Sequence, residues 1–170
     1  MFDFLIKRKI DSAFKNNKRK HALKNMESMH NVLILFSYTD WDVVSQIVQD
    51  LEQKGKKVLL WTIGTRKNKI DSPIFPINVR IIRQDEMSFF KILTSSVMDE
   101  FERLSYDTLI DLTTTRSNAF RYLLAQNTSE FCIGISESDQ KIYDFIILKN
   151  ENETLTETYG QIKFYLNNVC

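Results

Sequence analysis

Short runs of consecutive apolar residues recur along this chain, and each run is bounded by polar residues or turn formers. Runs of this kind are typical of strands that are covered on both faces. The strands predicted in this way are residues 32–36, 58–63, 79–82, 108–112, 131–135 and 143–148.

Apolar residues in the intervening segments recur at three or four positions, which is the spacing of one helix face. The predicted helices are residues 2–15, a segment that starts after Thr39 or Asp40 and stops at Gly55, and residues 89–104, 117–125 and 154–168. Residues 16–30 are predicted to be a polar linker or a frayed continuation of the first helix. Both prolines fall within residues 64–78, so no regular element is expected there.

Strands that alternate with helices of this length indicate right-handed βαβ crossovers and a parallel sheet. We therefore expect an α/β protein with a single Rossmann-like, three-layer domain. Its mainly parallel, six-stranded sheet is predicted to have the order 3-2-1-4-5-6, because the first three strands can wind one way and the others the opposite way. Residues 1–30 would form a basic amphipathic helix and linker, and residues 31–170 the Rossmann-like domain.

Composition supports one domain with a bulky core. The chain has 170 residues, of which 43% are hydrophobic, with 12 Phe and 6 Tyr but only 4 Gly and 2 Pro. So few turn formers argue against an all-β fold. The two cysteines, Cys132 and Cys170, make neither a disulfide framework nor a zinc pattern, so we expect no metal and no cofactor. Cys132 lies in an apolar run and is expected to be buried.

The sequence gives no sign of membrane insertion or secretion. No apolar stretch approaches the roughly 20 residues of a membrane-spanning helix. The basic start of the chain is not followed by the uninterrupted apolar region of a signal peptide. We therefore expect a cytoplasmic protein.

Charge is distributed unevenly. Residues 1–24 carry eight basic and two acidic side chains, a net charge of +6, whereas residues 25–170 carry 15 basic and 20 acidic ones, a net charge of −5. A basic tail on an acidic body is typical of an interaction segment, and it is equally consistent with a tail that lies on its own body.

The first helix has a wide apolar face that must be covered. That face is formed by Phe2, Leu5, Ile6, Ile10 and Phe14. We expect protein to cover it, either the chain's own body or a second subunit, which would make the helix a site for a homo-oligomer or a protein partner. An anionic membrane surface is less favoured because the polar residues 16–17 keep the helix short. Nucleic acid is less favoured because it would leave the phenylalanines without a role.

One place in the predicted sheet suits a ligand. Such sheets bind ligands beyond the carboxyl ends of the strands, where the strand order reverses, which here lies between strands one and four. Hydroxyl groups, a guanidinium and the start of a helix could together hold an anion there, and the first loop suits a polar ring or a hydroxyl-rich ligand. The candidate ligand-binding residues are Ser37, Tyr38 and Asp40 after strand one, and Thr113, Thr114, Thr115, Arg116 and Ser117 after strand four.

The alternative is that these residues are ordinary helix caps beside a surface arginine. Asp111, at the end of strand four, is expected to be buried and hydrogen-bonded, because an unpaired buried carboxylate would be costly.

Several enzyme classes are not indicated. The chain contains no G-x-G-x-x-G, no G-x-x-x-x-G-K-[ST] and no G-x-S-x-G sequence, which argues against the dinucleotide fingerprint, the P-loop and the nucleophile elbow. The histidines, His21 and His30, both precede the first strand. A Ser-His-Asp or Cys-His hydrolase in the α/β body is therefore not expected.

Two resemblances follow from these residues. Residues 106–112, Arg116-Ser117 and Ile133-Gly134 resemble part of the acceptor-side domain of heptosyltransferase-type GT-B glycosyltransferases, although 170 residues leave no room for the donor domain. The second resemblance covers nearly the whole length of the chain, and the matching segments are the basic helix, residues 32–36, 55–58, 106–112, 122–125, 131–134 and 143–147, and the last helix. Over these segments the chain resembles a family of small uncharacterised Bacteroidetes proteins, classed as a domain of unknown function. That resemblance implies the fold and a bacterial origin, and it supplies no activity.

Two functions are consistent with these observations. The first is a non-catalytic binding or protein-interaction module whose contact element is the basic helix. The second is a ligand-binding or enzymatic relative of nucleotide or sugar transferases that uses the carboxyl end of the sheet between strands one and four. The scarcity of His and Gly in the body favours the first.

Overall fold

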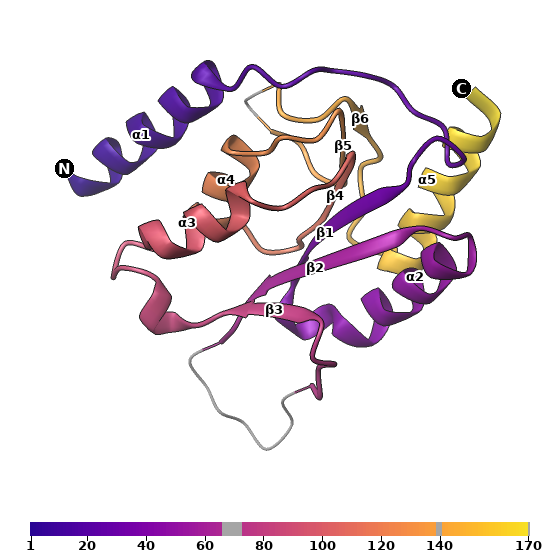
Figure 1. Ribbon diagram of the computed structural model, residues 1–170, viewed down its shortest axis with the longest axis horizontal. Helices are drawn as coiled ribbons and strands as arrows, with labels where there is room; N and C mark the ends of the chain where they lie inside the picture. Colours follow the sequence, from indigo (N-terminus) through magenta and orange to yellow (C-terminus); the bar gives the residue numbers. More distant parts are fainter. Residues whose placement is uncertain (66–72, 139–140, 170) are drawn as a thin grey trace.

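The strands of the computed structural model form one sheet (Figure 1). Residues 1–65, 73–138 and 141–169 are described; residues 66–72 of the loop expected at 64–78, and Cys170, lie outside this description. Within it, all neighbouring strands are parallel and the order is β3-β2-β1-β4-β5-β6, as predicted. The strands are β1 (Asn31–Ser37), β2 (Lys57–Ile63), β3 (Val79–Ile82), β4 (Thr108–Leu112), β5 (Phe131–Gly134) and β6 (Phe145–Ile146).

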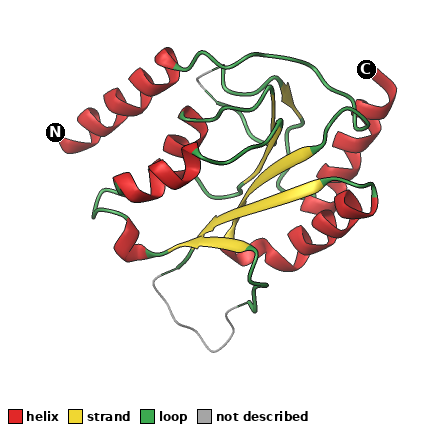
Figure 2. Ribbon diagram, in the orientation of Figure 1, coloured by secondary structure: helices red, strands yellow, loops and turns green. Residues whose placement is uncertain are grey.

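Helices cover both faces of this sheet (Figure 2). Helices α2 and α5 pack on one face and α3 and α4 on the other, while α1 lies outside α4. The helices are α1 (Phe2–Asn16), α2 (Trp41–Gln53), α3 (Ser95–Glu102), α4 (Asn118–Ala125) and α5 (Leu155–Val169). Within the described ranges, none of them combines the length and the apolar character that a membrane crossing requires.

The central strand β1 shows why the sheet needs two covered faces. Successive side chains of a strand point to opposite faces, so Val32, Ile34 and Phe36 pack with α2 and α5, while Leu33 and Leu35 pack with α3 and α4. All five side chains are fully buried. Residues 32–36 are therefore all apolar because both faces of β1 are buried.

Helix α1 packs on the chain's own body through one side. Ile6 and Ile10 are buried against α4, and the ammonium of Lys9 lies 5.4 Å from the centre of the Tyr122 ring. Phe14 packs against the core on the α3–α4 side. The chain's own body therefore covers part of the apolar face of this helix.

The helix predicted for residues 89–104 starts later than expected. Helix α3 begins at Ser95, because residues 88–92 form a tight turn instead. The N–H of Ser88 donates to the carbonyl of Ile92 at 2.8 Å, and Lys91 adopts a left-handed backbone with a φ of 60°. Such a φ is incompatible with a continuous helix, so Phe89 and Phe90 lie in a loop that the apolar spacing alone did not reveal.

The last predicted strand is also shorter than expected. Residues 143–148 were predicted as strand six, but β6 is only Phe145–Ile146. Tyr143 and Asp144 instead direct their side chains into two polar clusters at opposite ends of the sheet.

Candidate functional site

The structure joins the two predicted loops at the carboxyl edge of the sheet directly to each other. The hydroxyl of Ser37, at the end of β1, accepts hydrogen bonds from the backbone N–H groups of Thr114 at 3.0 Å and Thr115 at 3.3 Å. It also bonds to the hydroxyls of the same two threonines at 3.2 and 3.1 Å. The Thr114 hydroxyl in turn donates to Asp40 at 2.8 Å. Three of the hydroxyls predicted to bind a ligand, those of Ser37, Thr114 and Thr115, therefore bond to one another.

The remaining candidate residues have separate roles. The ring of Tyr38 packs on Phe75, with ring centres 4.9 Å apart. Ser117 caps α4 by accepting the N–H of Phe120 at 3.1 Å. Arg116 is exposed, and within the described part of the chain its guanidinium has no hydrogen-bond or ion-pair partner. Arg116 thus contributes an unpaired positive charge at this edge.

Asp111, at the end of β4, is buried and hydrogen-bonded, as predicted. Its carboxylate is 3% exposed and accepts the N–H of Thr113 at 3.0 Å, the hydroxyl of Thr113 at 2.6 Å and the phenol of Tyr143 at 2.6 Å. Burial raises the pKa of Asp111, and the bonds from Thr113 and Tyr143 act against that rise. Burial and the neighbouring charge of Asp111 raise the pKa of Tyr143 as well. The pair is therefore a tightly held buried acid and phenol.

Gly134 makes room for this pair. A Cβ atom at position 134 would lie 2.6 Å from atoms of the Tyr143 ring, which is closer than packed carbon atoms approach. The ring therefore lies across the end of β5, where only glycine fits, and reaches Asp111 from there. Tyr143 was not predicted as a site residue, because the apolar pattern places residue 143 in a strand. Glycine at a strand end was the available sign of a close approach.

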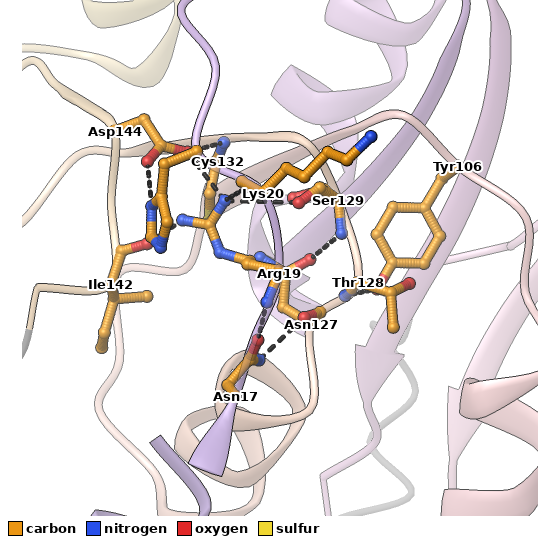
Figure 3. A network of polar contacts seen from close by, with 11 residues as sticks. Asn17, Arg19, Lys20, Tyr106, Asn127, Thr128, Ser129, Cys132, Ile142 and Asp144 are labelled. Carbon is orange, nitrogen blue, oxygen red and sulfur yellow. Dashed lines mark hydrogen bonds and ion pairs between the residues drawn. The ribbon is translucent and has the colours of Figure 1, made fainter. Parts of the chain in front are cut away.

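A second polar cluster lies on the segment before β1 (Figure 3). We call residues 17–30 the strap. Arg19 and Asp144 form an ion pair at 2.8 Å, and their side chains are only 5% and 9% exposed. Arg19 also donates to the carbonyl of Ile142 at 2.7 Å, and Asp144 also accepts the N–H of Cys132 at 2.8 Å. This cluster ties the start of the chain to the segment between β5 and β6.

The strap makes further contacts on both sides of Arg19. Asn17 donates from its side-chain amide to the carbonyls of Ala125 and Asn127, each at 2.8 Å, at the end of α4. Figure 3 shows the bond to Asn127. His21 lies 2.6 Å from Asp144. Sequence reasoning found neither Arg19 nor Asp144, and the complementary charges of tail and body were the available signal.

The end of the strap is bonded to Asp107, which lies just before β4. The carboxylate of Asp107 accepts the N–H groups of His30 at 3.0 Å and Asn31 at 2.6 Å, and Lys24 lies 3.6 Å from it. Burial would raise the pKa of Asp107, but these bonds, one from the Thr108 hydroxyl and the nearby charge of Lys24 lower it overall. The basic tail thus lies on its own body from residue 17 onward.

The first turn of α1 exposes apolar side chains next to the loop before α3. Phe2, Phe4 and Leu5 are each more than half exposed, and Phe89 is 81% exposed. The Phe2 and Phe90 rings stack with centres 5.0 Å apart, and Phe90 also contacts Phe89 at 5.5 Å. We call these five residues the apolar tip. The contact between Phe2 and Phe90 joins the part of the tip on α1 to the part on the loop.

Comparison with known proteins agrees with one part of the resemblances, the match to a domain of unknown function. A family model described as a family of unknown function (DUF6913) matches residues 3–169. The chain belongs to this family. Searches of curated proteins and of solved structures each found no significant match. Membership of the family, like the fold, assigns no activity to either polar cluster or to the apolar tip.

The geometry limits the chemistry of the candidate sites. Among the described residues, no group of three or more His, Cys, Asp or Glu side chains is arranged to hold a metal ion. Cys132 is fully buried, as predicted, and burial raises the pKa of its thiol. A buried thiol with a raised pKa is a poor nucleophile.

Replacing Tyr143 with Phe tests the buried acid. An acid whose pKa is raised by folding stabilises the protein most below its ordinary pKa, near 3.8, and less as the pH rises toward its folded pKa. Tyr143→Phe keeps the ring on Gly134, removes one bond to the carboxylate, and so raises that pKa further. We expect the free energy of unfolding in urea to fall by about 1–3 kcal/mol at pH 7 and by less at pH 3. Tyr165→Phe, at an exposed tyrosine, should change neither; equal losses at both pH values for Tyr143→Phe would contradict the pairing.

Replacing Arg19 with Met tests the strap. The substitution leaves the buried Asp144 without its closest cation and leaves the carbonyl of Ile142 without its donor, so we expect a loss of about 3–5 kcal/mol in the free energy of unfolding. Lys18→Met removes the same charge from the exposed neighbouring residue and should stay within about 0.5 kcal/mol of the parent. Similar denaturation midpoints for the two variants would show that the ion pair does not hold the strap.

Proposed function

We propose that this chain is a non-catalytic interaction module whose contact surface is the apolar tip. The observation that carries the proposal is the joint exposure of Phe2, Phe4 and Leu5 in the first turn of α1. The exposed Phe89 lies next to them through Phe90, which contacts Phe89 and stacks on Phe2. Single exposed apolar residues are common on protein surfaces, whereas a contiguous group of large ones typically marks a binding surface.

The way α1 is attached supports this proposal. Its inner side is buried through Ile6 and Ile10, and the strap that follows is bonded to the body through Asn17 and Arg19. The helix is therefore fixed at both its inner side and its far end, while its first turn stays uncovered. A contact element held in place in this way loses little conformational freedom on binding.

The carboxyl edge supports a non-catalytic role in another way. Ser37 and Asp40 bond across the two loops to Thr114 and Thr115. These bonds account for half of the eight predicted site residues as structural links between the loops after β1 and β4. A cytoplasmic location and a Bacteroidetes origin are part of the proposal; they rest on the composition and on the resemblance.

Fractionation of cells that naturally produce the protein tests this function. The double variant Phe4→Ser/Leu5→Ser makes the tip polar without touching the buried side of α1. We expect it to move from bound, fast-sedimenting fractions into the free fraction, because the contact surface is lost. Phe164→Ser is the matched control, since Phe164 on α5 is 61% exposed and Phe4 in the tip is 66% exposed; it should sediment like the parent. A tip variant that sediments like the parent would exclude the tip as the contact surface.

A second candidate function is favoured by Arg116. A guanidinium without a partner among the described residues, beside the switch point of a parallel sheet, suits a ligand with a phosphate group. The partial resemblance to sugar transferases points to the same place. On this view the chain is a ligand-binding or enzymatic relative of nucleotide or sugar transferases.

A thermal-shift screen with nucleotides, sugar nucleotides and inorganic phosphate tests the second candidate. A ligand present at a hundred times its dissociation constant stabilises the folded state by about 2.7 kcal/mol. The shift should disappear in Arg116→Gln and persist in Arg103→Gln, which removes an exposed arginine at the end of α3. A screen in which no compound raises the melting temperature would count against this function.

A further inference from the structure

The charges beside the apolar tip follow a simple order along α1. The exposed apolar residues Phe2, Phe4 and Leu5 occupy the first turn, and three consecutive exposed basic residues, Lys7–Lys9, occupy the next. Consecutive helical residues are 100° apart, so three of them spread around much of the helix. We call these three residues the basic collar. Apolar and basic groups are thus separated along the helix axis, with about 7 Å between their mean positions.

The acidic residues of α1 lie to one side of this surface. Asp3 is exposed in the first turn, but it is seven residues before the buried Ile10 and so falls on the same stripe of the helix as Ile10. Asp11 lies 3.9 Å from Arg121 of α4. By contrast, Lys7 and Arg8 have no hydrogen-bond or ion-pair partner within the described ranges. The outward surface of the first turns is therefore apolar and positive.

This pattern discriminates between the possible occupants of the tip. Two copies of the chain that met tip to tip would bring two basic collars together, and like charges at an interface are unfavourable. An anionic lipid surface complements both parts at once, because its acyl boundary takes apolar side chains and its headgroups take cations. Apolar faces of interfacial helices enter this boundary by about 5–10 Å, which matches the separation of the tip from the collar.

We propose that the apolar tip inserts into the surface of a membrane that contains anionic lipids, with the basic collar at the headgroups. Phe2, Phe4, Leu5 and Phe89 enter the acyl boundary, and Lys7 and Arg8 contact lipid phosphates and carboxylates. The contact is reversible, since a few apolar side chains and a few cations together bind a membrane weakly. This inference rests on the proposed function and names the partner of the same surface.

Co-sedimentation of the full chain with lipid vesicles tests the inference. One set of vesicles contains phosphatidylcholine alone, and the other an equimolar mixture of phosphatidylcholine and phosphatidylserine. We expect the parent protein to sediment with the mixed vesicles at low salt, to be released as salt is added, and to stay in solution with phosphatidylcholine alone.

Two double variants separate the contributions. Lys7→Gln/Arg8→Gln should weaken partitioning about 30-fold, the effect of two basic residues near an anionic surface. Phe4→Ser/Leu5→Ser should weaken it on the order of 100-fold, because two large apolar side chains no longer enter the lipid. Lys57→Gln/Arg103→Gln, which removes two exposed cations from β2 and the end of α3, should bind like the parent.

The outcomes that overturn the inference differ from those that overturn the proposed function. A parent protein that ignores the mixed vesicles at low salt excludes the lipid partner, and so does a tip variant that binds as tightly as the parent. If the tip variant nevertheless leaves the bound fraction in cells, the interaction module stands and its partner is a protein. A dimer of the parent that the tip variant loses, seen by sedimentation velocity, would identify that partner as a second copy.

Discussion

Burial of the sheet on both faces is the constraint on which the rest of the molecule depends. Because β1 is central and covered on each side, its side chains from Val32 to Phe36 must be apolar, and the helices must divide between the two faces. The chain before β1 therefore has to leave from the amino edge of the sheet. This segment, the strap, runs from the sheet to the end of α4, and the inner side of α1 packs on α4 (Figure 1).

The two ends of the sheet are closed by different chemistry. At the carboxyl edge, neutral hydroxyls dominate, and Ser37 links the loops after β1 and β4 while Tyr143 reaches the buried Asp111. At the amino edge, the links are ionic, and Arg19 and Lys24 meet Asp144 and Asp107. A buried ion pair is costly to assemble, and removing one partner is costlier still. The strap is therefore held in the one position in which Arg19 meets Asp144.

The sequence predicted the features that have a local pattern. The apolar run of β1, the strand order and the burial of Asp111 all follow from periodicity and from the topology of parallel sheets. The predicted start of α3 was wrong because the spacing of apolar residues does not reveal the left-handed backbone of Lys91. The contacts of Arg19 and Tyr143 join segments far apart in the chain, and no single-sequence pattern records such pairs. The loops that carry the predicted ligand residues lie together at one edge, where the hydroxyls of Ser37, Thr114 and Thr115 bond to each other.

The ion pair of the strap also has a consequence for synthesis of the chain. Arg19 and Asp144 are 125 residues apart, so the strap cannot be locked until the segment after β5 has left the ribosome. At about 5–20 residues per second, that wait lasts roughly 6–25 s. Until α4 has been made, both sides of α1 are uncovered, and its phenylalanines and isoleucines are open to chaperones, to lipid and to other nascent chains. Helix α1 is thus made well before the elements that hold it.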